Sequence, residues 1–173
     1  MISVRDEYLA AMGEVTVNFQ SLEATTRMFA AGLISPDQKL GLIVTSQQSF
    51  QRLCQLLDAL FRYRSTSEER LRQLTELLKQ ASTAEERRNS MVHSIWLTSE
   101  PDKEGRETVA RVKISTKQKH GLKVNFEAIQ PHDLRALANE LRGLVVAMSQ
   151  LYSATRGAGE ASLPLELSLD AEN

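Results

Sequence analysis

The sequence has one cysteine among 173 residues, which excludes an intrachain disulfide and favours a reducing compartment. The N-terminus lacks the basic and apolar regions of a secretory signal peptide. No apolar run approaches the roughly 20 residues that a membrane-spanning helix needs. We therefore expect a cytoplasmic protein that makes no membrane contact.

Aromatic residues are also scarce, at 5% of the chain, so the core must be built mainly from aliphatic side chains. The formal net charge of -1 gives no overall attraction to nucleic acids or to anionic membranes. Binding to a polyanion would require a local basic cluster. The length is that of a single domain with a real hydrophobic core.

A helical period dominates the first part of the chain. Apolar side chains, with one polar exception, recur there at alternating steps of four and three. They are Tyr8, Met12, Val15, Phe19, Leu22, Thr26, Phe29 and Leu33. This spacing predicts one long helix that packs against other helices and ends near Leu33, before Pro36.

Three capping-box patterns indicate where the next helices begin. Thr45-x-x-Gln48 predicts the start of a second helix, and Thr66-x-x-Glu69 predicts the start of a third. Thr83-x-x-Glu86 is a further match, so the segment after it either continues the third helix or forms a new element after a kink.

The character of the sequence changes after Trp96. Residues 94–99 and 107–115 predict two short strands around a turn, and residues 122–129 predict a third strand or an extended connection. A last helix is expected to begin at Pro131, to bury leucines spaced by three and four, and to stop at Gly157.

The sequence thus predicts a mainly all-α fold. We expect a bundle of four or five helices over residues 1–157, with a small β insertion at about 97–129 before the last helix. Residues 158–173 are acidic and have no helical period, which predicts a mobile tail.

The segment "RRNSMVHSIW" concentrates chemically active side chains in Arg88, Asn89 and His93. On a helix, Asn89 and His93 share a face, whereas Arg88 and His93 differ in direction by about 140°. A long arginine side chain can still reach a phosphate near the imidazole, and a second copy of the segment across a two-fold axis can complete a site.

These three residue types suit cleavage of an RNA phosphodiester without a metal. Histidine exchanges protons near neutral pH, and arginine binds phosphate oxygens with a planar fork. Asparagine can donate to one neighbour and accept from another, and so orient both. The three histidines are scattered and pair with no cysteine at zinc spacing, so we expect neither a metal nor another cofactor.

The stretch "RNSMVH" resembles the R-x4-6-H motif of HEPN domains, and "HSIW" is similar to the continuation seen in many bacterial members. The long first helix and the late helix "LRALANELRGLVVAMSQLY" match the family as patterns over roughly residues 5–156. The β insertion is longer than a minimal bundle of this type needs.

The resemblance implies a metal-independent endoribonuclease that serves as a toxin or in antiviral (phage) defence. It implies that Arg88 and His93 are catalytic, that Asn89 polarises or positions them, and that RNA is the substrate. It also implies a homodimer with a composite active site, and some such toxins are silenced by a partner antitoxin.

Two alternatives stay open. The chain can be a non-catalytic HEPN-like module that binds a nucleotide, RNA or a partner protein. It can also be a plain interaction bundle, with His93 partly buried against a carbonyl and Arg87 and Arg88 solvated among Glu85 and Glu86.

The clearest basic cluster lies in the insertion. Its lysines are Lys113, Lys117, Lys119 and Lys123, with no acidic residue between the first and the last. They are candidates for RNA phosphate contacts, and a solvated, lysine-rich loop is an equal alternative.

Three other residues near the motif or on the helices have simpler interpretations. We expect Trp96 and Cys54 to be core residues. Glu23 can reach the motif arginine from the first helix, although a solvated position is the preferred interpretation.

Overall fold

The computed structural model describes residues 3–65, 67–99, 108–117 and 121–157. The expected tail, the expected turn at 100–105 and Lys119 lie outside these ranges. Within these ranges the fold is mainly helical, with five helices and one small antiparallel sheet before the last helix, as the sequence predicts. In chain order the elements are α1 (Val4–Ile34), α2 (Gln38–Thr45), α3 (Phe50–Arg64), α4 (Glu68–Val92), β1 (Ile95–Thr98), β2 (Val109–Lys117), β3 (Gly121–Ala128) and α5 (Pro131–Gly157).

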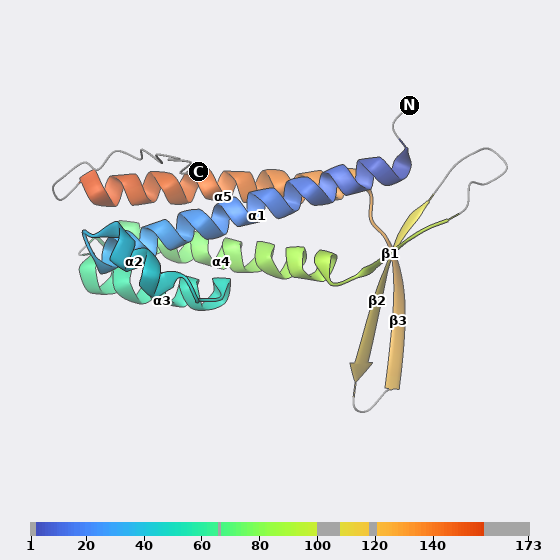
Figure 1. Ribbon diagram of the computed structural model, residues 1–173, viewed down its shortest axis with the longest axis horizontal. Coiled ribbons are helices and arrows are strands. Elements are labelled where there is room, and N and C mark those ends of the chain that lie inside the picture. The colour runs from blue at the N-terminus through green and yellow to red at the C-terminus, as the bar shows by residue number, and fades with distance from the viewer. Residues whose placement is uncertain (1–2, 66, 100–107, 118–120, 158–173) are drawn as a thin grey trace, which may run out of the picture.

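The long helices lie side by side, and the sheet projects from one end of the bundle (Figure 1). Helices α1 and α5 run in the same direction: the Tyr8 hydroxyl donates to Ile129 O at one end, and the Asn18 amide donates to Ala138 O further along. Helix α4 runs the opposite way and returns the chain to the sheet end of the bundle. The short helices α2 and α3 cover the other end.

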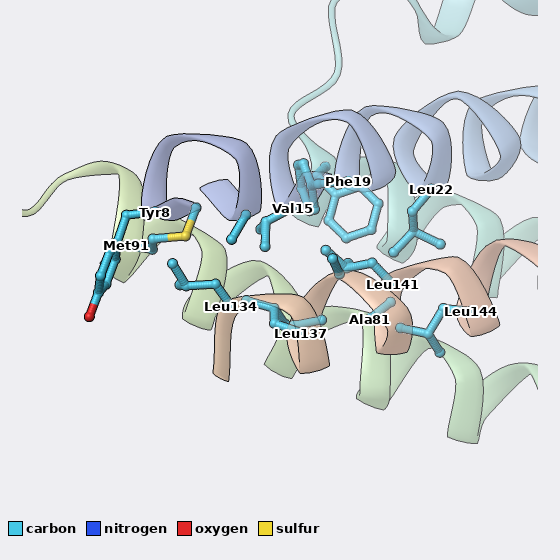
Figure 2. Packing of buried hydrophobic residues seen from close by; sticks show 14 of the residues in the cluster. Tyr8, Val15, Phe19, Leu22, Ala81, Met91, Leu134, Leu137, Leu141 and Leu144 are labelled. Atoms are coloured by element: carbon cyan, nitrogen blue, oxygen red, sulfur yellow. The ribbon is translucent and has the colours of Figure 1, made fainter. Parts of the chain in front are cut away.

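The seam of α1, which is the series of eight side chains from Tyr8 to Leu33 spaced by four and three, forms the centre of the core. Every member of the seam is buried except Met12, which is partly buried and packs against the core. Figure 2 shows residues of α1 facing Ala81 and Met91 of α4 and the leucines of α5. A second cluster continues the core toward α2 and α3, with Phe29 edge-to-face on Phe61 and Leu74 fully buried beside them. The four-and-three spacing therefore identified the packed face of α1 correctly.

The helix starts differ from two of the capping predictions. The helix expected from Thr45 begins instead at Phe50, where the Ser49 hydroxyl accepts from Arg52 N. Thr45 is the last residue of α2, which the sequence analysis missed, and its hydroxyl donates to Gly41 O. Asp37, directly after Pro36, caps α2 by accepting from the N–H groups of Lys39 and Leu40.

Helix α4 is one continuous element. Its cap is Ser67, one residue after the expected Thr66, and the Ser67 hydroxyl accepts from Arg70 N. Thr83 starts no new helix, because its hydroxyl donates to Lys79 O within the helix. A threonine hydroxyl that bonds to its own helix in this way cannot act as an N-cap.

The β insertion is a three-stranded antiparallel sheet in the order β1-β2-β3. Ile95 pairs with Val112, and Val112 pairs with Phe126 on its other side. The segment predicted as a third strand or an extended connection is therefore a strand. None of the described helices has both the length and the apolar character needed to cross a bilayer.

Helix α2 packs closely on α1 at Gly41. A Cβ atom placed on Gly41 would meet the backbone of Ala31, with Cα and C of that residue at 2.8 Å. Backbone cannot move as a side-chain end can, so we expect Gly41→Ala to lower the free energy of unfolding by about 1–3 kcal/mol.

The matched control is Gly143→Ala on α5, where nothing lies within 4 Å of the added atom. There the substitution should stabilise the protein by about 0.5–1 kcal/mol, because alanine favours a helix. Urea denaturation of both variants measures the difference. Equal midpoints would contradict the close approach at Gly41.

Candidate functional site

The motif predicted from the sequence lies at the C-terminal end of α4. Arg88 and Asn89 are in the last two turns, and His93 is the C-cap, with its backbone N–H bonded to Asn89 O at 3.0 Å. Helical spacing turns Arg88 toward the packed side of α4, in the sector of Ala81 and Ala84. The imidazole of His93 is turned away from that side and is exposed.

Arg88 is partly buried against α1. Its guanidinium stacks over the Phe19 ring, 4.9 Å from the centroid, and Nη1 donates to Asn89 Oδ1 at 2.9 Å. Its Nε is buried and has no acceptor. Within the ranges that the structure describes, no carboxylate forms a salt bridge with Arg88. A partly buried cation without a direct anionic partner is unusual, because burial of a charge is costly unless it is paired.

Asn89 connects Arg88 to a carboxylate that the sequence analysis left among the solvated residues, Glu85. The Asn89 side chain is hydrogen-bonded to Glu85, and it accepts from Arg88 at the same time. The amide group thus lies between the carboxyl of Glu85 and the guanidinium of Arg88. The sequence could have indicated Glu85 by its spacing, because Glu85, Asn89 and His93 recur at intervals of four residues on one stripe of the helix.

The environment of Glu85 favours its neutral form. Burial raises the pKa of Glu85 above its ordinary value, and the charges of Glu23 and Glu86 raise it further. The hydrogen bond from Asn89 and the charge of Arg88 lower the pKa but do not cancel the rise. Glu85 thus interacts electrostatically with Arg88 but forms no salt bridge with it in the described part of the chain.

Glu23 reaches this cluster from α1 but does not bond to Arg88. Its carboxylate pairs with Arg27 at 2.5 Å, and both side chains are about four-fifths buried. Arg27 also donates to the carbonyls of Thr45 and Ser46, so the pair anchors the end of α2 on α1. The preferred interpretation of Glu23 as a solvated residue is wrong, because it is partly buried and paired.

The structure also differs in detail from the plain-bundle alternative, in which His93 is partly buried and both arginines are solvated. His93 is exposed and forms no side-chain hydrogen bond within the described part of the chain. Arg88 is turned inward rather than solvated. Arg87 forms its ion pair across the helix interface with Glu140 of α5, instead of with Glu85 or Glu86.

A groove of about 290 Å³ lies on the other side of α4, between this helix, the sheet and the start of α5. Its polar residues include Arg87, Ser90 and Arg111, and its floor is apolar. The cations in it are already neutralised, since Arg87 pairs with Glu140 and Arg111 pairs with Glu127. Arg88, Asn89 and His93 do not line this groove.

The structure places three of the four candidate RNA-binding lysines on the strands of the sheet. Lys113 on β2 and Lys123 on β3 are exposed and lie on the same sheet face, by the register of the two strands. Lys117 is the last residue of β2. Lys113 follows Val112, which pairs with Ile95 two residues beyond His93, whereas Lys123 lies further along the hairpin, opposite Ser115. The hairpin itself projects away from the helices (Figure 1).

Trp96 and Cys54, which were predicted to be core residues, are partly buried and pack against the core cluster. The Trp96 ring lies 6.1 Å from that of Tyr8, and its Nε1 donates to Met91 O at 3.1 Å. Cys54 packs against the same cluster, and burial, with the charge of Glu85, raises the pKa of its thiol to about 12. A thiol with so high a pKa holds almost no thiolate at neutral pH, so Cys54 is not a nucleophile.

Among the described residues, no group of three or more His, Cys, Asp and Glu side chains is placed to hold a metal ion. Comparison of the chain with protein-family models, with curated proteins and with solved structures gives no match. The geometry of the Glu85–Arg88–Asn89–His93 cluster is therefore the basis for proposing a function.

Proposed function

We propose that this chain is a metal-independent endoribonuclease of the HEPN type that acts as a toxin or an antiviral-defence effector. The observation that carries the proposal is the position of Arg88 and its contacts. This guanidinium is held by Phe19 and Asn89, forms no salt bridge with a carboxylate of the described residues, and lies on α4, whose C-cap is His93.

Such an arginine suits the charge that grows on a phosphate during cleavage. Its position is fixed in advance, so little reorganisation is needed when the phosphate arrives. Partial exclusion of water strengthens its attraction for an anion. A surface arginine already paired with a carboxylate, such as Arg87, would have to give up that partner first.

The direction of His93 favours a site completed by a second copy. Arg88 and the imidazole of one chain diverge by about 140° around α4, so one phosphate between them needs a second copy's motif or a bent RNA strand. In the proposed reaction, one imidazole takes the 2′-hydroxyl proton as that oxygen bonds to phosphorus. The bond from phosphorus to the 5′-oxygen breaks, and the imidazolium of the second copy protonates that oxygen.

The same divergence favours a second candidate function, namely a non-catalytic module that binds a nucleotide, RNA or a partner protein. Arg88 with its orphan Nε would then recognise an anionic group, and His93 would add only a contact at the rim. This candidate predicts binding of RNA without cleavage.

Cleavage of mixed cellular RNA in excess EDTA tests the proposal. We expect the wild-type protein to cut RNA and to leave 2′,3′-cyclic phosphate and 5′-hydroxyl ends. His93→Ala should lower the rate by about 10²–10⁴-fold, which is the usual contribution of general acid–base catalysis.

The matched control is His132→Ala, since His132 is a highly exposed histidine of the same chain that lies outside the motif. It should cleave like the wild type. Equal losses in both variants, or full activity of His93→Ala, would refute a catalytic His93. RNA binding by the wild type without any cleavage would favour the second candidate.

A further inference from the structure

The three-stranded sheet has one face made almost wholly of apolar side chains. Strand alternation and the observed register place residues from all three strands on this outer face. The members whose side chains the structure describes are Ile95, Leu97, Ala110, Val112, Ile114, Val124, Phe126 and Ala128. Not one of these eight is charged or has a polar side chain, and the paired strand positions Thr116 and Leu122 belong to the same face by register.

Most of this outer face is open to solvent in the single chain. Phe126 is 69% exposed, and Ile95, Leu97, Ile114 and Val124 are each between 42% and 54% exposed. Only Val112, in the middle of the central strand, is buried. Monomeric proteins seldom leave so many neighbouring large apolar side chains exposed without a function.

The opposite face of the sheet already has its partner, the helical bundle. Trp96 bonds to Met91 O, Arg111 donates to Ser90 Oγ, and Val109 is buried in the core cluster. Further along the hairpin this inner face carries the exposed Lys113 and Lys123. The bundle therefore cannot cover the outer face, which points away from it.

The placement of charge decides which kind of partner suits the outer face. Binding to an anionic membrane or to nucleic acid needs cations beside the apolar contact. Here Lys113 and Lys123 lie on the other side of the sheet, and the outer face has a single aromatic ring, that of Phe126. A protein surface that is itself apolar is the matching partner.

The size of the outer face fits a second copy of this chain. At roughly 150–200 Å² for a fully exposed large apolar residue, the five exposed side chains present about 500 Å² per copy, and about 1,000 Å² when two copies stack. That total reaches the lower bound for a specific interface. The other exposed apolar group, Leu40, Ile43 and Val44 on α2, has three members and is smaller.

We infer that two copies of the chain associate by stacking the outer faces of their sheets around a two-fold axis. Such a contact is self-complementary, because the same apolar patch serves on both copies. Stacked sheets pack about 10 Å apart, so Phe126 and Ile114 of one copy fill the space against the other. The inference goes beyond the proposed function and does not depend on it, since association is measured without RNA.

Sedimentation velocity of the full chain at several concentrations tests the inference. We expect the wild-type protein to form a dimer at micromolar concentration. The double variant Ile114→Ser and Phe126→Ser should be monomeric, with a dissociation constant raised at least about 100-fold. It should keep its helical circular dichroism and melt at the temperature of the wild type diluted to its monomer. These side chains are exposed in the single chain, so their replacement leaves the fold intact.

The matched control is Ile43→Ser on α2, where the original side chain is 70% exposed. It should dimerise like the wild type. A monomeric wild type at 100 µM concentration, roughly the weakest range of specific association, would overturn the inference. So would a dimer that survives the double variant or that is lost with Ile43→Ser.

Discussion

Replacement of Phe29 by alanine should lower the free energy of unfolding by about 3–5 kcal/mol, which is the usual cost of deleting a buried aromatic side chain. Phe29 is fully buried where α1 meets α3 and α5. Its ring lies 5.7 Å from that of Phe61 at 90° and 4.9 Å from that of Tyr152. The substitution removes both ring contacts and leaves a cavity between three helices. The packed helices cannot move close enough together to fill it.

Urea denaturation followed by circular dichroism measures this loss. The matched control is Val17→Ala, on the same helix, where the side chain is 65% exposed. It should change the free energy of unfolding by less than about 0.5 kcal/mol. A cost below about 1 kcal/mol for Phe29→Ala would show that the second core cluster is not packed as described.

The same residue shows why much of the fold was predictable. Phe29 belongs to the four-and-three seam of the first 33 residues, and that seam is the buried face of α1. A period of this length arises only when one helix face is packed, so the pattern carries the tertiary contact within it. The leucines of α5 and the alternation of the strands were readable for the same reason.

The capping predictions failed because a capping box is a local sequence pattern. Thr45-x-x-Gln48 has the sequence of a capping box, yet Thr45 ends α2 and Ser49 caps α3. Several serines and threonines near one another can each cap a helix, and tertiary contacts choose among them. Here Gly41 fits against Ala31 and Arg27 holds the carbonyls of Thr45 and Ser46, contacts that no local pattern predicts.

The candidate site was predictable in its residues but only partly in its geometry. The spacing predicted that Asn89 and His93 share a stripe of the helix and that His93 diverges from Arg88. It did not reveal that Phe19 would hold Arg88, since this contact joins residues far apart in the sequence. The role of Glu85 depends on its burial near Cys54 and Glu23, which only the packed helices define.

Arg88→Met should separate the function of this arginine from its structural contribution. Methionine keeps an unbranched apolar stem over Phe19 and removes a buried Nε that has no acceptor. Because a buried, unpartnered polar group is costly, we expect the free energy of unfolding to stay within about 1 kcal/mol of the wild type. We expect RNA cleavage to fall by about 10²–10³-fold, since the phosphate loses its fixed cation.

The neighbouring arginine supplies the matched control. Arg87→Met breaks an ion pair with Glu140 in which both side chains are more than one-third exposed, and such pairs contribute about 0–1 kcal/mol. It should leave cleavage nearly unchanged, because Arg87 points toward α5 and not toward the Asn89–His93 stripe.

The free energy of unfolding and the rate of RNA cleavage are to be measured for both variants. A large loss of stability in Arg88→Met would mean that the guanidinium is a structural group held by Phe19 and Asn89. Equal cleavage by the two variants would remove Arg88 from the proposed reaction, since only one of them alters the motif.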